Sequence, residues 1–172
     1  MRLLSLLALT LVLPLSACDS DSDDDMNNNL STITELVVAN AQLSTLEAAV
    51  IEAELDDDLA SAGPFTVFAP TDAAFGDLLD ALDATPEELL ARDDLGSILS
   101  YHVVSGMTVR AADISVGQTV ATLGSGVFTI VAAGTGLGID TDGDGAADAR
   151  IITTDVEASN GVVHLIDAVL LP

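Results

Sequence analysis

The pattern with the most specific chemistry is a run of alternating aspartates in the C-terminal part of the chain. Asp140, Asp142 and Asp144 alternate with other residues, and Gly145 and then Asp148 follow. Hard cations such as Ca²⁺ prefer oxygen ligands, and this order follows the first nine positions of a calcium-binding loop, in which the sixth is a glycine at a sharp turn. We therefore predict that Asp140, Asp142, Asp144 and Asp148 form a calcium site.

The loop departs from the EF-hand pattern at its twelfth position, where Ile151 replaces the bidentate glutamate. It looks more like the Asp-x-Asp-x-Asp-Gly repeats of thrombospondin type 3 modules. A single copy without that acid predicts weak binding, on the order of 10⁻⁴ to 10⁻³ M, as in extracellular modules. The alternative is an acidic turn that only keeps the surface solvated, and the sequence leaves both open.

The chain contains two histidines, His102 and His164, which an acid–base mechanism would have to use. In many hydrolases the nucleophilic serine lies in a Gly-x-Ser-x-Gly turn, and the sequence contains no such motif. Adjacent carboxylates are so abundant that no pair stands out as an acid and a base. We expect both histidines to be hydrogen-bonded packing residues, and we predict no catalytic residue and no enzyme.

The single cysteine, Cys18, lies at the end of a secretion signal. Arg2 precedes the apolar run Leu3–Leu15, which is too short for a bilayer span of about 20 residues. The sequence Leu15-Ser16-Ala17-Cys18 resembles a bacterial lipobox, which implies cleavage of residues 1–17 and lipidation of Cys18. The alternative is an ordinary signal peptide that leaves Cys18 as a free thiol. The prediction is a secreted lipoprotein anchored to the cell envelope, with the inner or outer membrane left open.

Composition divides the rest of the chain into a tether and a domain. Residues 18–29 hold the cysteine and then Asp, Ser and Asn with Met26 as the one apolar residue, which predicts an acidic disordered tether. Residues 30–172 are predicted to form one domain. The formal net charge is −24 and the chain has no lysine, which excludes nucleic acid as a partner because phosphate binding needs clustered cations. The oligomeric state stays open.

Helical patterns fill the first half of the domain. Thr32 with Glu35, and Thr85 with Glu88, have the spacing of capping boxes, and Thr71 or Asp72 can cap a helix between them. The second half has short β-branched segments separated by glycines. One predicted strand, 65–68, lies within the helical half, and the others are 108–110, 119–123, 127–131, 151–154 and 162–166. Asn160-Gly161 predicts a turn of positive-φ residues immediately before the last strand. Helices followed by strands predict an α+β domain.

Three segments in this order resemble the fasciclin (FAS1) domain family. The first is Thr66-Val67-Phe68-Ala69-Pro70-Thr71-Asp72-Ala73-Ala74-Phe75, the second is Tyr101-His102, and the third is Asn160-Gly161-Val162-Val163-His164-Leu165-Ile166-Asp167. Together they frame residues 30–172. The resemblance implies a fasciclin-like wedge of β-strands with a layer of short α-helices.

The resemblance also implies a role in adhesion to cell-surface, matrix or glycan partners, which the calcium loop would support. Two other functions remain as alternatives. The first is a self-associating structural envelope protein in which calcium bridges acidic surfaces. The second is a hydrolase, for which the sequence gives little support because it would have to use His102 or His164.

Overall fold

The computed structural model describes residues 30–171 and contains six short helices and seven strands in that range. The helices are α1 (Ile33–Ala39), α2 (Ser44–Glu52), α3 (Asp56–Ala60), α4 (Asp72–Leu82), α5 (Pro86–Leu90) and α6 (Leu95–Tyr101). The strands are β1 (Phe65–Pro70), β2 (Val103–Ser105), β3 (Thr119–Ala121), β4 (Val127–Ala133), β5 (Gly136–Asp140), β6 (Ala149–Ala158) and β7 (Gly161–Ile166). The predicted signal peptide, Cys18 and the tether lie outside the described residues.

Three helices, α1, α4 and α5, begin where the local sequence predicts. The Thr32 side chain accepts a hydrogen bond from the Glu35 backbone N–H, and the Glu35 carboxylate accepts one from the Thr32 N–H, so both halves of the capping box form. Thr85 and Glu88 repeat this arrangement at the start of α5. These bonds satisfy N–H groups that have no partner within a helix.

Thr71 caps α4 through a bond from the Ala74 N–H, whereas Asp72 has a different role. Its carboxylate accepts hydrogen bonds from the Ser44 hydroxyl and the Thr45 N–H, each 2.8 Å long. The expectation that Asp72 could cap its own helix is therefore wrong. Asp72 ties the first turn of α2 to the start of α4, a contact between segments that local spacing does not encode.

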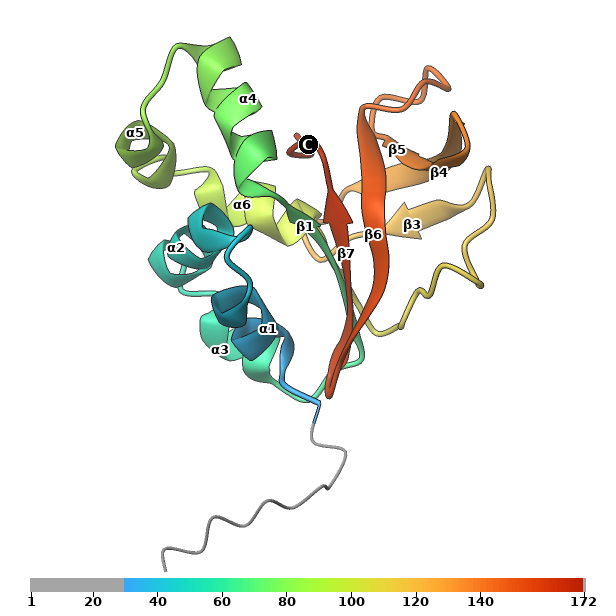
Figure 1. The fold of residues 1–172 in the computed structure, drawn as a ribbon, viewed down its shortest axis with the longest axis horizontal. Coiled ribbons are helices and arrows are strands. Elements are labelled where there is room, and N and C mark those ends of the chain that lie inside the picture. The colour runs from blue at the N-terminus through green and yellow to red at the C-terminus, as the bar shows by residue number, and fades with distance from the viewer. Residues whose placement is uncertain (1–29, 172) are drawn as a thin grey trace, which may run out of the picture.

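The strands form one sheet in the order β2-β1-β7-β6-β5-β4-β3, in which only the β1–β7 pair is parallel. The sheet curls until its two edges approach. The Leu123 N–H, just after β3, donates to the Val103 carbonyl of β2 over 2.7 Å. Figure 1 shows the helices gathered on one side of β1 and β7, with β3, β4 and β5 on the other. The architecture confirms the predicted α+β wedge with a layer of short helices.

The β1–β7 pair lies between two hydrophobic cores, so both strands are buried on both faces. Val67 and Leu165 face the helices and pack with residues of α1, α2 and α6. Phe68 and Ile166 face the inside of the curled sheet, where they pack with Phe128. Side chains alternate between the faces of a strand, so one short segment serves both cores.

Three features of the strand half differ from the sequence predictions. Gly136–Asp140 forms β5, where no strand was predicted. Residues 108–110 do not form a strand, and Val103–Ser105 pairs with β1 instead. Asn160-Gly161 does connect β6 and β7 as predicted, but neither residue has the positive φ expected of them. Gly161 is required for another reason: a Cβ there would overlap the Phe65 carbonyl oxygen.

Candidate functional site

The two histidines lie in the interior, and their hydrogen bonds fix their tautomers. His102 is 1% exposed, and its Nδ1 donates to the Ile98 carbonyl over 2.8 Å. Its Nε2 accepts from the Leu170 backbone N–H over 2.9 Å, so the ring must be neutral to make both bonds. Burial lowers the pKa of His102 to about 4, against the opposing effect of the Ile98 carbonyl.

His164 is held in the same way on the other side of β1. It is fully buried, its Nε2 donates to the Val109 carbonyl over 2.7 Å, and its Nδ1 accepts from the Asp155 N–H over 3.3 Å. Burial lowers the pKa of its imidazole, and the bond to Val109 partly opposes this. The ring stacks on Phe68 with a centroid separation of 5.3 Å.

Thr66 completes this buried polar group. Its hydroxyl donates to the Met107 carbonyl over 3.0 Å and accepts from the Val109 N–H over 2.8 Å. We call Thr66, His102 and His164 the polar centre. Within residues 30–171 neither imidazole bonds to a hydroxyl or thiol, and each ring nitrogen already has a backbone partner. The polar centre therefore positions the 107–109 segment and the C-terminal segment, and it offers no acid–base group to a substrate.

The aspartate loop joins β5 to β6. Carboxylate oxygens of Asp140, Asp142 and Asp148 all lie within 4.8 Å of one another, whereas Asp144 is not part of this group. Gly145 has a φ of +85°, which supports the predicted need for glycine at the turn. The structure thus brings together three of the four predicted carboxylates.

Backbone N–H groups already bind these carboxylates. Asp140, which is 3% exposed, accepts from Gly143 over 2.6 Å and from Gly145 over 2.9 Å. The Gly143 bond lowers the pKa of the Asp140 carboxyl, burial opposes this, and the Gly145 bond adds to the lowering. Asp140 is therefore held as an anion. Each carboxylate oxygen has two acceptor sites, so the set of hard oxygen donors still fits a divalent cation.

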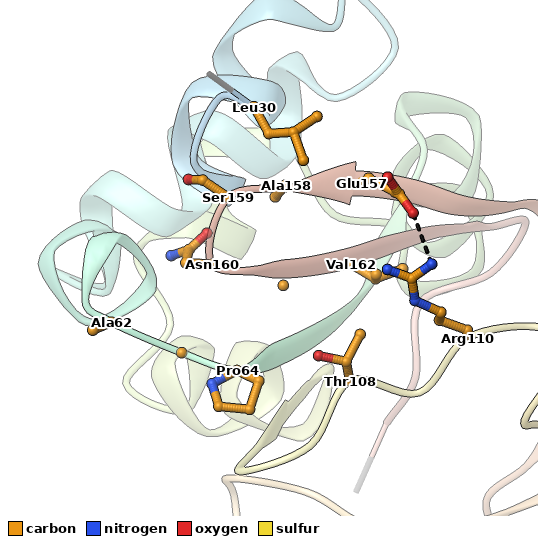
Figure 2. A pocket seen from close by; sticks show the side chains of 12 residues that line it. Leu30, Ala62, Pro64, Thr108, Arg110, Glu157, Ala158, Ser159, Asn160 and Val162 are labelled. Carbon is orange, nitrogen blue, oxygen red and sulfur yellow. Dashed lines mark ion pairs between the residues drawn. The ribbon is translucent and has the colours of Figure 1, made fainter. Parts of the chain in front are cut away.

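A second candidate site is an open pocket of about 400 Å³ beside the β6–β7 turn. Figure 2 shows Arg110 reaching Glu157 along one wall, with Pro64 and Thr108 nearby. The Arg110 and Glu157 side chains form an ion pair of 2.8 Å, so the pocket has no unpaired cation there. Its size suits a small polar ligand, but its lining includes no histidine or cysteine.

Asn160, which also lines this pocket, has a role that its sequence context does not predict. Its side-chain oxygen Oδ1 accepts from the Ile33 N–H, and its side-chain Nδ2 donates to the carbonyls of Leu59 and Ser61. One side chain thus ties the β6–β7 turn to α1 and α3. The Asn-Gly pair indicated only a turn, and no local signal predicted these distant partners.

Among residues 30–171, none of the helices has the length and hydrophobicity of a membrane-spanning segment. The predicted lipidation site, Cys18, lies outside these residues.

Comparison with known proteins gives consistent matches over the folded region. The family model of the Fasciclin domain matches residues 41–172. Protein sll1483 of Synechocystis sp. is 43% identical over 146 residues, covering 82% of this chain and 73% of that protein. Cell surface glycolipoprotein MPB83 of Mycobacterium bovis is 34% identical over 140 residues, covering 77% of this chain and 57% of the relative.

The fold also matches a solved structure. The FAS1 domain pair from the insect cell adhesion molecule Fasciclin I aligns with a TM-score of 0.71 at 18% identity, covering 84% of this chain and 52% of that chain. At this identity the likeness concerns the fold alone.

Proposed function

The chain belongs to the fasciclin domain family, and we propose that it is a lipid-anchored surface protein whose domain binds cell-surface, matrix or glycan partners. Membership of this family of adhesion and surface proteins confirms the prediction that the chain is not an enzyme. The observation that carries the proposal is the family match over 41–172, which covers nearly all of the described domain.

The proposed surface location rests on the N-terminal sequence and on one relative. The run before Cys18 has the pattern of a lipoprotein signal, and MPB83 is named a cell surface glycolipoprotein. Labelling of cells with a radioactive or clickable fatty acid tests the anchor. The expected result is label on the wild-type chain and none on Cys18→Ser, whereas label retained by that variant would contradict the anchor.

The polar centre supports binding over catalysis as the proposed activity. Its imidazoles are neutral, buried and committed to backbone partners, so they cannot move a proton to or from an external substrate. Recognition would then depend on surface shape and charge, which one fold can vary widely.

The experiment for the proposed function uses the chain from residue 18 onward, without lipid. Its binding to glycan arrays, matrix proteins and whole cells is measured once with calcium and once with EDTA. Saturable binding to at least one of these classes is expected. Absence of binding in both buffers, together with calcium-dependent oligomers in sedimentation, would replace the proposal with a self-associating envelope protein.

The proposal also includes weak binding of calcium by the aspartate loop. It is supported by the three converging carboxylates, by the anionic Asp140 and by the turn at Gly145. Titration with calcium should shift the NMR signals of residues 140–148 with a Kd on the order of 10⁻⁴ to 10⁻³ M. Asp142→Ala should weaken this response and the exposed control Asp77→Ala should not. Signals that do not move at about 10 mM calcium would contradict the site.

A further inference from the structure

An apolar groove of about 230 Å³ lies between α1, α2 and α3, which are neighbours in Figure 1. Its floor is formed by the buried side chains of Val37, Val50 and Leu59, one from each helix. Val38 and Ile51 also line the groove and are 56% and 58% exposed. The groove is therefore an apolar surface that opens onto solvent and continues into the hydrophobic core beneath the helices.

The size of the groove favours side chains of a protein partner over a complete small molecule. Pockets that enclose drug-sized ligands have volumes of about 300 to 1,000 Å³, and this groove lies below that range. The walls are helices whose backbone groups are bonded within each helix, so they present no free strand edge. Recognition must therefore occur through side chains, as when an amphipathic helix lies in a hydrophobic groove.

The charged side chains that line the groove are both acidic. Glu47 and Asp56 are half-buried at its margin, and neither belongs to the ion pairs in residues 30–171, which are Arg92–Asp94 and Arg110–Glu157. No lysine, arginine or histidine occurs between residues 30 and 91. A cationic group placed beside the groove would meet carboxylates that have no competing partner.

The negative charge of the groove favours a basic occupant over an acidic one. A second copy of the chain would bring a net charge of −24 against an equally acidic surface, which disfavours close contact. The acidic segment 19–29 of the same chain is disfavoured for the same reason, because it holds aspartates and a single apolar residue, Met26. The remaining complementary occupant is a partner that carries both apolar and basic side chains.

We propose that the groove between α1, α2 and α3 docks a cationic amphipathic helix of a partner protein. Apolar side chains of the partner, spaced one helical turn apart, enter between Val38 and Ile51, and its lysines or arginines approach Glu47 and Asp56. The inference rests on the proposed binding function, for which it names one class of partner.

The test uses the chain from residue 18 onward and an 18-residue peptide probe of leucine and lysine. The leucines are placed at i, i+3, i+4 and i+7, so that they form one face of a helix. A peptide with glutamate in place of lysine and a scrambled leucine–lysine peptide are the comparison probes. Calorimetry gives the affinities, and NMR shifts map the contact. Binding of the patterned cationic peptide alone, with shifts in α1–α3, is the expected result.

Matched variants separate the groove from general attraction to an acidic protein. Ile51→Glu should weaken binding by about tenfold or more, and Ile152→Glu, an isoleucine of similar exposure on β6, should leave it unchanged. Glu47→Gln should weaken it by about threefold or more, and the exposed Glu87→Gln should not. Equal effects of a groove variant and its control would overturn the proposal, because they would show non-specific electrostatics.

Other occupants give different results. A dimer that Ile51→Glu dissociates would assign the groove to a second copy. A spin label on Cys18 that broadens the α1–α3 signals would assign it to the chain's own N-terminal segment. Either outcome overturns the proposal. If the glycan, matrix and cell panel shows binding that Ile51→Glu does not affect, the groove proposal fails while the proposed binding function stands.

Discussion

The polar centre and the groove between α1, α2 and α3 differ in whether their side chains already have partners within the domain. Thr66 and His164 are fully buried and His102 is 1% exposed, and in the described chain no buried side-chain nitrogen or oxygen lacks a hydrogen-bond partner. The groove has no reactive group, yet Val38 and Ile51 expose more than half of their surface there. The histidines, although they are potentially reactive, therefore have a structural role. The groove, which has exposed apolar side chains and carboxylates outside any ion pair, can contact a partner.

Among variants that alter the polar centre or the groove, the largest expected effect is a loss of stability in His164→Ala. The change leaves the Val109 carbonyl and the Asp155 N–H without their partner and removes the ring that stacks on Phe68. We expect the free energy of unfolding to fall by about 4 kcal/mol. Urea denaturation measures it, and a loss below about 1 kcal/mol would contradict a structural role.

The pH dependence of stability tests the neutral state of His102. Its pKa is about 4 in the folded protein and 6.5 ordinarily, so the unfolded chain binds more protons between these values. The contribution of His102 to stability is therefore fully present above pH 6.5 and is lost as the pH drops toward 4, by up to about 3 kcal/mol. His164 acts in the same direction because its pKa is also lowered.

His102→Gln isolates this contribution. The glutamine amide can donate to the Ile98 carbonyl and accept from the Leu170 N–H, but it does not titrate. Denaturation at pH 7, 5.5 and 4.5 should show a smaller loss of stability for the variant than for the wild type. Equal losses would show that His102 is not held neutral.

Thr66→Val is expected to have a smaller effect. Valine keeps the shape and the preference for a strand but leaves the Met107 carbonyl and the Val109 N–H unbonded. The expected loss is about 2 kcal/mol by urea denaturation. A neutral result would mean that water satisfies these groups and that the polar centre is less closed than its burial indicates.

The smallest effect on stability is expected in the groove. Ile51 is 58% exposed, so Ile51→Glu should change the free energy of unfolding by no more than about 0.5 kcal/mol. The same urea denaturation checks it. A loss above about 1.5 kcal/mol would show that Ile51 supports the helix packing, and the groove would then not be a free surface.

The parts of the fold that sequence analysis predicted are the parts that depend on nearby residues. The capping boxes at Thr32 and Thr85 and the turn at Asn160-Gly161 involve partners within a few positions, and all three occur. The order of helical and strand segments predicted the α+β class, and the family resemblance implied the wedge with its layer of helices. His102 and His164 were also predicted to be hydrogen-bonded packing residues, although their partners and their neutral state were not predicted.

The features that sequence analysis missed depend on contacts between distant segments. The parallel pairing of β1 with β7 and the bond between Asp72 and Thr45 appear only when the chain is folded. The predicted strand at 108–110 is wrong because Thr66 and His164 hold that segment through a side-chain hydroxyl and an imidazole instead of a strand ladder. The groove has no sequence signature because it depends on how three short helices pack.

The most direct measurement is a map of the surface that a bound partner protects, obtained by NMR or hydrogen exchange with the panel member that binds most tightly. Protection confined to α1, α2 and α3, with unchanged signals from His102 and His164, is the predicted result. Protection centred on the polar centre or the segment 107–109, with the helices unaffected, would contradict the division between a structural interior and a binding groove.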